Sequence, residues 1–156
     1  MKREVDLIVI HCSASKETVD YTFEQCIRDH RARGFHTCGY HRFISKDGTV
    51  HFGRDFDHVG AHVAGHNGHS IGICYEGGCD KNGKAKDTRT EEQKIALIQV
   101  ITEAVLWAEG NITRICGHRD MSPDKDGDGV VEPHEWVKAC PCFDASPEYY
   151  SLLNAI

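Results

Sequence analysis

The chain has 156 residues, of which 40% are hydrophobic and 27% charged, the balance of one globular domain rather than of a disordered chain. Its formal charge of −6 argues against a nucleic-acid-binding protein, which would need a basic surface. The sequence contains no apolar run of about 18 residues, which argues against a membrane span, and its first residues do not have the pattern of a signal peptide.

The first half of the chain predicts a strand, a helix and a hairpin. A β-branched apolar run over 5–11 is typical of a buried strand, and a helical pattern over 22–33 ends at the stop signal Gly34. Two alternating runs flank Lys46-Asp47-Gly48, which predicts a β-hairpin. Residues 56–69, rich in Gly and His, are expected to form an irregular loop.

The second half continues the alternation of strands and helices. Strands are expected over 70–75 and 111–117. A capping box opens at Thr90, and the helix that follows should run to about Glu109 and be largely buried, because it is apolar on most faces. Shorter helical segments are expected near 133–139 and from Ser146-Pro147 onward. The order predicts a single α/β domain over 1–156, with a central mixed β-sheet and helices on both faces.

Eight cysteines and eleven histidines are the unusual counts. Cysteine, at about 5% of the residues, stays below the roughly 8–10% that marks a disulfide scaffold, and without a signal peptide we expect mostly reduced thiols. Cys26 is expected to pack in the core. A bridge from Cys26 to Cys38, or between Cys74 and Cys79 across a turn, is conceivable, but no pattern in the sequence favours either one.

Three metal-ligating side chains stand at or near the ends of predicted elements. His11 closes the first strand, His118 follows the strand over 111–117, and Cys140 lies in the segment KACPCF. Two imidazoles and one thiolate would give zinc three protein ligands and an open fourth position, as in catalytic sites. Spacing alone does not single out these three. A rival structural site, closed by Cys116, His118, Cys140 and Cys142, would leave His11 without a role.

Five segments, in this order, carry a resemblance to a known family: IVIHCSAS, GYHRFISKDGTVHFGR, GAHVAGHNGHSIGICYEGG, GHRD and KACPCFD. They resemble the zinc-dependent N-acetylmuramoyl-L-alanine amidases, the group that includes phage lysozyme-type amidases and peptidoglycan recognition proteins. The resemblance extends from about residue 5 to residue 144. It implies a central mixed sheet flanked by helices, and hydrolysis of the amide bond between N-acetylmuramic acid and L-alanine in peptidoglycan or muropeptides.

The resemblance also assigns roles to single residues. It places the zinc ligands at His11, His118 and Cys140, catalytic groups at Tyr40 and Lys138, and substrate contacts at His62 and Asn67. Neighbouring strand residues point to opposite faces, so His41 should turn away from a metal that Tyr40 faces. The alternative is a recognition module that binds muropeptide without cleaving it. Such relatives typically lack the cysteine ligand, so Cys140 favours the enzyme.

An insertion at about 122–136 fits the calcium-loop pattern D-x-D-x-D-G-x5-E. Glu132 occupies a position where a ligand often acts through a water. The alternative to a calcium site is a solvated Asp/Gly turn. No helix is expected before the loop, so a paired EF-hand is not expected and a lone loop would bind calcium weakly. We hypothesise that calcium would fix the insertion and thereby hold Lys138 and Cys140. The expected calcium ligands are the side chains or carbonyl of Asp124, Asp126, Asp128, Val130 and Glu135.

The expected partner is peptidoglycan or a muropeptide, with neither nucleic acid nor a membrane span involved, and a monomer is expected. Without a signal peptide the protein should be cytoplasmic, or reach the cell wall when the cell lyses. Both a phage or prophage lysis enzyme and a muropeptide-recycling enzyme fit this expectation, and the sequence does not separate them.

Overall fold

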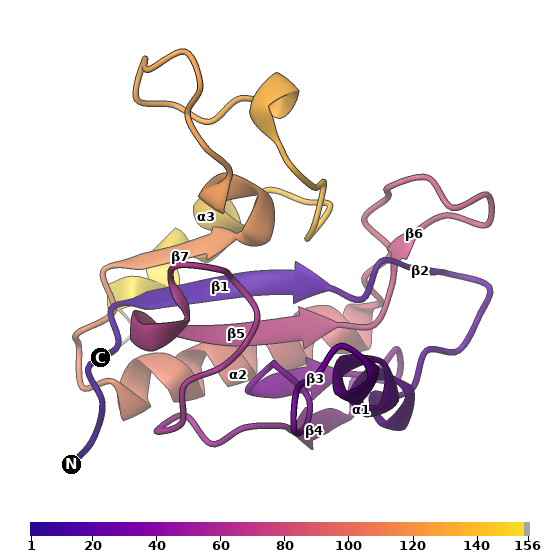
Figure 1. Cartoon of the computed structure of the whole chain (residues 1–156), viewed down its shortest axis with the longest axis horizontal. Coiled ribbons are helices and arrows are strands. Elements are labelled where there is room, and N and C mark those ends of the chain that lie inside the picture. The colour runs from indigo at the N-terminus through magenta and orange to yellow at the C-terminus, as the bar shows by residue number, and fades with distance from the viewer. Residues whose placement is uncertain (155–156) are drawn as a thin grey trace.

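A five-stranded mixed sheet forms the centre of the computed structural model, which describes residues 1–154 (Figure 1). The strands lie in the order β4-β3-β5-β1-β7, and only the β3–β4 pair is antiparallel. This confirms the predicted α/β architecture. The strands of this sheet are β1 (Leu7–Cys12), β3 (Arg42–Ile44), β4 (Val50–Phe52), β5 (Ser70–Tyr75) and β7 (Arg114–Gly117).

The alternation of side chains along β1 divides the molecule into two layers. Ile8 and Ile10 belong to the main core, together with side chains of α2 (Glu91–Trp107) and α3 (Ala145–Tyr149). The side chains that alternate with them along the strand, such as Val9, point to the opposite face of the sheet and lie in separate clusters there, on the side where α1 (Phe23–Ala32) packs (Figure 1). His11 lies two residues after Val9, so its imidazole points to the same face of the sheet as Val9, which α2 does not cover.

Both long helices begin where the sequence indicates. The Thr22 side chain accepts from the backbone N–H of Gln25, and Thr90 forms the predicted capping box with Gln93. Burial of α2 differs from the expectation. One face is fully packed, but three apolar side chains of the outer face are about half exposed: Ile95, Ile98 and Leu106. Within residues 1–154 no helix has the length and apolar character that crossing a membrane requires.

Two local predictions need correction. The helix expected near 133–139 is only a 3-10 turn, Pro133–Glu135, after which Trp136 is extended. A second, two-stranded parallel sheet, made of β2 (Ser15–Lys16) and β6 (Gly78–Cys79), was not anticipated. Its strands are two residues long, too short for an alternating pattern to be visible. The hairpin of β3 and β4 is as predicted, with Lys46-Asp47-Gly48 in its turn.

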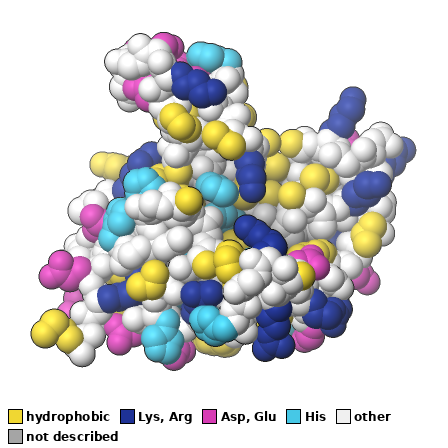
Figure 2. Space-filling model, in the orientation of Figure 1, with side chains coloured by type: hydrophobic (Ala, Val, Ile, Leu, Met, Phe, Trp, Pro, Cys, Tyr) yellow, Lys and Arg dark blue, Asp and Glu magenta, His cyan; other side chains and the backbone are white. Residues whose placement is uncertain are grey.

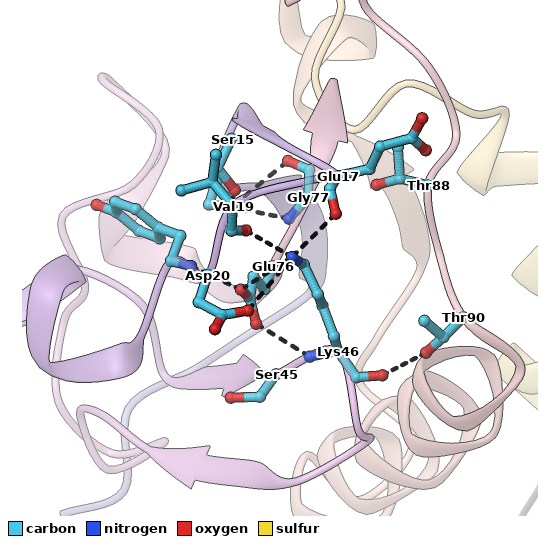
Figure 3. Close-up of polar contacts among 12 residues, drawn as sticks. Ser15, Glu17, Val19, Asp20, Ser45, Lys46, Glu76, Gly77, Thr88 and Thr90 are labelled. Atoms are coloured by element: carbon cyan, nitrogen blue, oxygen red, sulfur yellow. Dashed lines mark hydrogen bonds and ion pairs between the residues drawn. The ribbon is translucent and has the colours of Figure 1, made fainter. Parts of the chain in front are cut away.

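A buried carboxylate ties the hairpin turn to the segment that leads into α1 (Figure 3). Glu76, 5% exposed at the end of β5, accepts hydrogen bonds from the backbone N–H groups of Tyr21 at 2.7 Å and Lys46 at 3.1 Å. The Lys46 ammonium lies 3.8 Å from the same carboxylate. The Lys46 carbonyl in turn accepts from the Thr90 hydroxyl at 2.6 Å, which joins the hairpin to the start of α2. These bonds fix where α1 starts relative to the sheet.

Candidate metal centre and cavity

The structure brings the three expected zinc ligands together. His11 lies near the end of β1, and His118 directly follows β7, which pairs with β1 in parallel. Cys140 reaches the same point from the turn after the insertion. The candidate ligand atoms of the three residues all lie within 4.8 Å of one another. Two buried strands thus hold the imidazoles, whereas the thiol comes from a segment more than 20 residues farther along the chain.

A second histidine orients His11. The Nε2 atom of His11 lies 2.9 Å from Nδ1 of His62, and Nε2 of His62 lies 3.1 Å from the Ser70 hydroxyl. The nitrogen of His11 left for a metal is therefore Nδ1. With a metal there, His11 Nε2–H can donate to His62, and His62 Nε2–H to Ser70, so one chain of hydrogen bonds sets both tautomers. Burial lowers the pKa of both histidines and keeps them neutral, as metal ligation requires.

His62 was expected to contact substrate, and the structure gives it a different first task. It borders the cavity, but both of its ring nitrogens are engaged by His11 and Ser70. The strand beneath it makes room for this ring, because a Cβ at Gly72 would lie 2.5 Å from the imidazole of His62. Sequence reasoning missed this support. The signal was the small residues at 70 and 72 of β5, which share the strand face of the site.

Backbone groups place the Cys140 sulfur. Its Sγ accepts a hydrogen bond from the backbone N–H of Cys12 at 3.1 Å. The turn is fastened to the domain by Arg119 N–H, which donates to the Cys140 carbonyl at 2.7 Å, and by the Tyr75 hydroxyl, which donates to the Pro141 carbonyl at 2.6 Å. The donor set fits zinc: two neutral imidazoles and one sulfur that receives a hydrogen bond.

The rival four-ligand site is not supported by the geometry. The Cys116 sulfur contacts Met121 Sδ at 3.6 Å, and the Cys142 sulfur lies 3.2 Å from the Gly78 carbonyl oxygen. Among residues 1–154, neither joins His118 and Cys140 in a cluster of candidate ligands. Within the described part of the chain this cluster consists of His11, His118 and Cys140, and all three residues line a cavity.

A cavity of about 770 Å³ opens beside the three ligands, and both expected catalytic residues line it. The Tyr40 ring centroid lies 5.1 Å from that of His11, and burial raises the pKa of its phenol, so Tyr40 stays protonated. Lys138 is exposed on the cavity wall. The pKa of His118 is lowered mainly by the burial of His118 and, as a second cause, by the positive charge of Lys138. Figure 2 shows histidine side chains gathered around the hollowed centre of this face.

Two further positions singled out by the sequence, Asn67 and His41, differ in whether they line the cavity. Asn67 lines it, and its Oδ1 accepts from the backbone N–H groups of His62 and Val63, both at 2.9 Å, so it shapes the loop as well. His41 turns away, as expected. Its Nδ1 accepts from the Gly72 N–H at 3.0 Å, and its Nε2 lies 2.8 Å from the His58 carbonyl oxygen.

The insertion projects from the domain beyond β7 (Figure 1). Carboxylate oxygens of Asp124, Asp126 and Asp128 lie within 4.8 Å of one another, and all three residues are exposed. Glu135 is 1% exposed and accepts from backbone N–H groups within the loop, including Lys125 at 2.7 Å. These hydrogen bonds, of which the one from the Glu132 N–H has the largest effect, lower the pKa of Glu135 to about 2. Glu135 thus closes the loop, and the three aspartates form its acidic surface.

Comparison with known proteins decides the family. The family model described as N-acetylmuramoyl-L-alanine amidase matches residues 1–141. The chain belongs to the N-acetylmuramoyl-L-alanine amidase family. The endolysin of Klebsiella phage KP32 is 36% identical over 143 residues, which cover 92% of this chain and 84% of that protein. The endolysin of Escherichia phage T7 is 34% identical over 143 residues, with the same coverage of both chains.

Solved structures agree with this family. The N-acetylmuramoyl-L-alanine amidase LysC from Clostridium intestinale superposes with a TM-score of 0.70 at 26% identity, over 98% of this chain and 85% of that one. Drosophila PGRP-LB, at 23% identity and a TM-score of 0.67, shares the fold. The protein is thus an N-acetylmuramoyl-L-alanine amidase, and the alternative of a recognition module without activity is not supported. The predicted metal, catalytic and substrate roles of single residues stay predictions.

Proposed function

We propose that this amidase is zinc-dependent and cleaves the bond between N-acetylmuramic acid and L-alanine in peptidoglycan or muropeptides. The observation that carries the proposal is the meeting of His11, His118 and Cys140 at the wall of a cavity, with one side open. Zinc held there would supply a Lewis acid that activates water and polarises the scissile carbonyl at neutral pH. The family match and the endolysin relatives support the substrate class.

The chain's own residues have separable tasks in this proposal. The Tyr40 hydroxyl, protonated in its partly buried setting, can orient the attacking water and pass a proton toward the leaving amine. Lys138 places a positive charge where negative charge develops on the carbonyl oxygen. His62 is a positioning residue, because it acts through His11. The walls of the cavity near Asn67 are proposed to hold the muropeptide.

The test combines metal content with product identity. Purified protein, stripped with a chelator and then reloaded with zinc, is given a defined muropeptide, and the products are identified by mass spectrometry. We expect free stem peptide beginning with L-alanine only from the reloaded protein. His11→Ala should lose both zinc and activity, whereas the matched exposed-site variant His36→Ala should keep both. Full activity of the stripped protein, or of His11→Ala, would disprove the proposal.

We also propose a calcium site in the insertion. Its support is the complete sequence motif together with the clustering of the Asp124, Asp126 and Asp128 carboxylates. In this proposal Val130 contributes its carbonyl, Glu135 closes the loop, and calcium steadies the segment that leads to Lys138 and Cys140. The zinc-loaded protein should melt at a higher temperature with calcium than with magnesium. In Asp126→Ala/Asp128→Ala this difference should vanish; an unchanged difference would remove the site.

The biological setting of the reaction is proposed from the relatives. Because two of them are named as phage endolysins, we infer a lysis enzyme of phage or prophage origin that acts on the cell wall once released from the cytoplasm, as a monomer. The competing role is recycling of soluble muropeptides. Activity on intact purified cell-wall sacculi supports lysis; activity confined to soluble muropeptides supports recycling. Light scattering of the zinc-loaded protein measures its oligomeric state.

A further inference from the structure

Two buried cysteines lie side by side behind the wall of the cavity. Cys26 on α1 and Cys38, in the turn before Tyr40, are 1% and 0% exposed, and their Sγ atoms are 3.8 Å apart. The Nε2 atom of His30 lies 3.9 Å from the Cys26 sulfur, and candidate ligand atoms of all three residues fall within 4.8 Å of one another. The proposed hydrolysis uses none of these residues.

The hydrogen bonding of His30 argues against a metal ion in this cluster. Its Nδ1 accepts a hydrogen bond from the backbone N–H of Gly39 at 2.7 Å. A neutral imidazole whose Nδ1 accepts carries its proton on Nε2. The nitrogen that faces the sulfurs is therefore a hydrogen-bond donor without a lone pair to offer. A metal at this position would be left with the two cysteines alone.

The same donors favour a thiolate. The backbone N–H of Tyr40 donates to the Cys38 sulfur at 3.4 Å. The hydrogen bond from Cys26, with those from His30 and Tyr40, lowers the pKa of Cys38. The bond with Cys38, together with burial, raises the pKa of Cys26. The two sulfurs thus lie in van der Waals contact, with N–H donors directed at them, which is the arrangement of a reactive dithiol.

We propose that Cys26 and Cys38 form a redox-active pair that a hydroperoxide converts to an intramolecular disulfide. The thiolate attacks the O–O bond, which breaks; a sulfenic acid forms on that sulfur, and the departing oxygen takes a proton from solvent. The second sulfur then attacks the sulfenic sulfur and forms the S–S bond. Its proton leaves with the displaced hydroxide as water. Two thiols are oxidised, and the hydroperoxide is reduced to an alcohol or water plus one further water.

The cavity gives the oxidant a route and the disulfide an effect. Cys26 and His30 border the same cavity as the metal ligands, and the Cys38 sulfur lies 3.8 Å behind that of Cys26, so a small hydroperoxide in the cavity approaches the pair from the side of Cys26. A disulfide requires the sulfurs to approach to about 2 Å, which pulls α1 and the turn at 38 together. Tyr40 is bonded to that turn, and its ring lies 5.2 Å from the ring of His30. Oxidation should therefore displace Tyr40 and lower the amidase activity, a consequence that rests on the proposed function.

The experiment first follows the covalent change, which needs no amidase activity. Zinc-loaded protein is treated with equimolar hydrogen peroxide, alkylated and digested without reduction. We expect a cross-linked peptide pair containing Cys26 and Cys38, lighter by two hydrogen atoms than the separate peptides, which a reductant separates. Cys26→Ala, Cys26→Ser and Cys38→Val should yield no such pair. Cys116→Ala, which removes an equally buried thiol with no other cysteine in contact, should still yield it.

The second readout is activity on a muropeptide. Peroxide should lower wild-type activity about tenfold, within the range that a misplacement of about 1 Å costs, and reductant should restore it. The Cys26 variants should lose much less, which separates the pair from direct oxidation of Cys140. Absence of the cross-linked pair in oxidised wild type would overturn the proposal. So would a second zinc per chain that Cys26→Ala removes. A cross-link formed in a protein that is inactive even when reduced would instead count against the proposed function.

Discussion

His11 is 2% exposed and is held by a partly buried histidine, which a sheet hydroxyl supports in turn, whereas Asp124, Asp126 and Asp128 are exposed and bond to the backbone of their own loop. Both regions gather side chains suited to a cation. In the first, residues far apart in sequence are brought together by a packed sheet; in the second, one stretch of twelve residues contains every candidate ligand. A substitution in the first region should therefore affect residues that are far apart in sequence, whereas a substitution in the second should affect only its own loop.

Loss of a metal ligand should have the largest effect. Cys140→Ser removes the sulfur that accepts a hydrogen bond from the Cys12 N–H and puts a hydroxyl, a poorer zinc ligand, in its place. We expect a loss of activity beyond the roughly 100-fold that removal of an outer hydrogen-bonding partner costs, together with zinc loss on dialysis. Activity assays and metal analysis by mass spectrometry measure both. Cys79→Ser, at a partly exposed thiol away from the cavity, serves as the control. Wild-type activity in Cys140→Ser would contradict the assignment.

Removal of the cavity lysine should come next. Lys138→Met takes away the charge proposed to stabilise the developing oxyanion, a contribution worth about 100-fold to 1000-fold in kcat elsewhere. Zinc content should stay the same, because Lys138 is not a ligand. Lys125→Met, which removes an exposed lysine of the insertion, should leave kcat unchanged. Equal kcat values in the two variants would mean that Lys138 is merely a solvated charge.

Disruption of the support for His11 should follow in size. His62→Ala removes the partner of His11 Nε2 and should weaken zinc affinity about 10-fold to 100-fold. Gly72→Ala should act in the same direction without touching His62 itself, because its Cβ would collide with that ring. A competition assay with a zinc-binding dye measures the affinities. His66→Ala, in the same loop, should change little. If zinc affinity survived in His62→Ala, the hydrogen-bonded chain would have no part in metal binding.

The two regions also differ in how well the sequence predicts them. The insertion could be located and its candidate ligands named from a local motif, because its spacing is fixed within one loop. The strands of the metal centre were equally visible, but spacing alone could not select His11 and His118 from many histidines; only the family resemblance did so. The support from His62 and the contact of Cys26 with Cys38 depend on how the loop over 56–69 and α1 fold onto the sheet. Neither packing has a local sequence pattern.

The smallest effect is expected from the carboxylate that closes the insertion. Glu135→Gln puts an amide where a carboxylate accepts the N–H groups of Lys125 and Glu132, so one donor would face another. Hydrogen exchange over 122–136 should rise at neutral pH, and activity with zinc saturating should fall by only a few-fold. Because the folded pKa is lowered to about 2 from 4.5, this stabilisation is complete above about pH 4.5 and is lost as the pH falls toward 2. Exchange in the wild type should therefore approach that of Glu135→Gln only across this interval. If the variant instead lost activity as completely as Cys140→Ser, the insertion would be part of the metal centre, and the contrast between the two regions would be wrong.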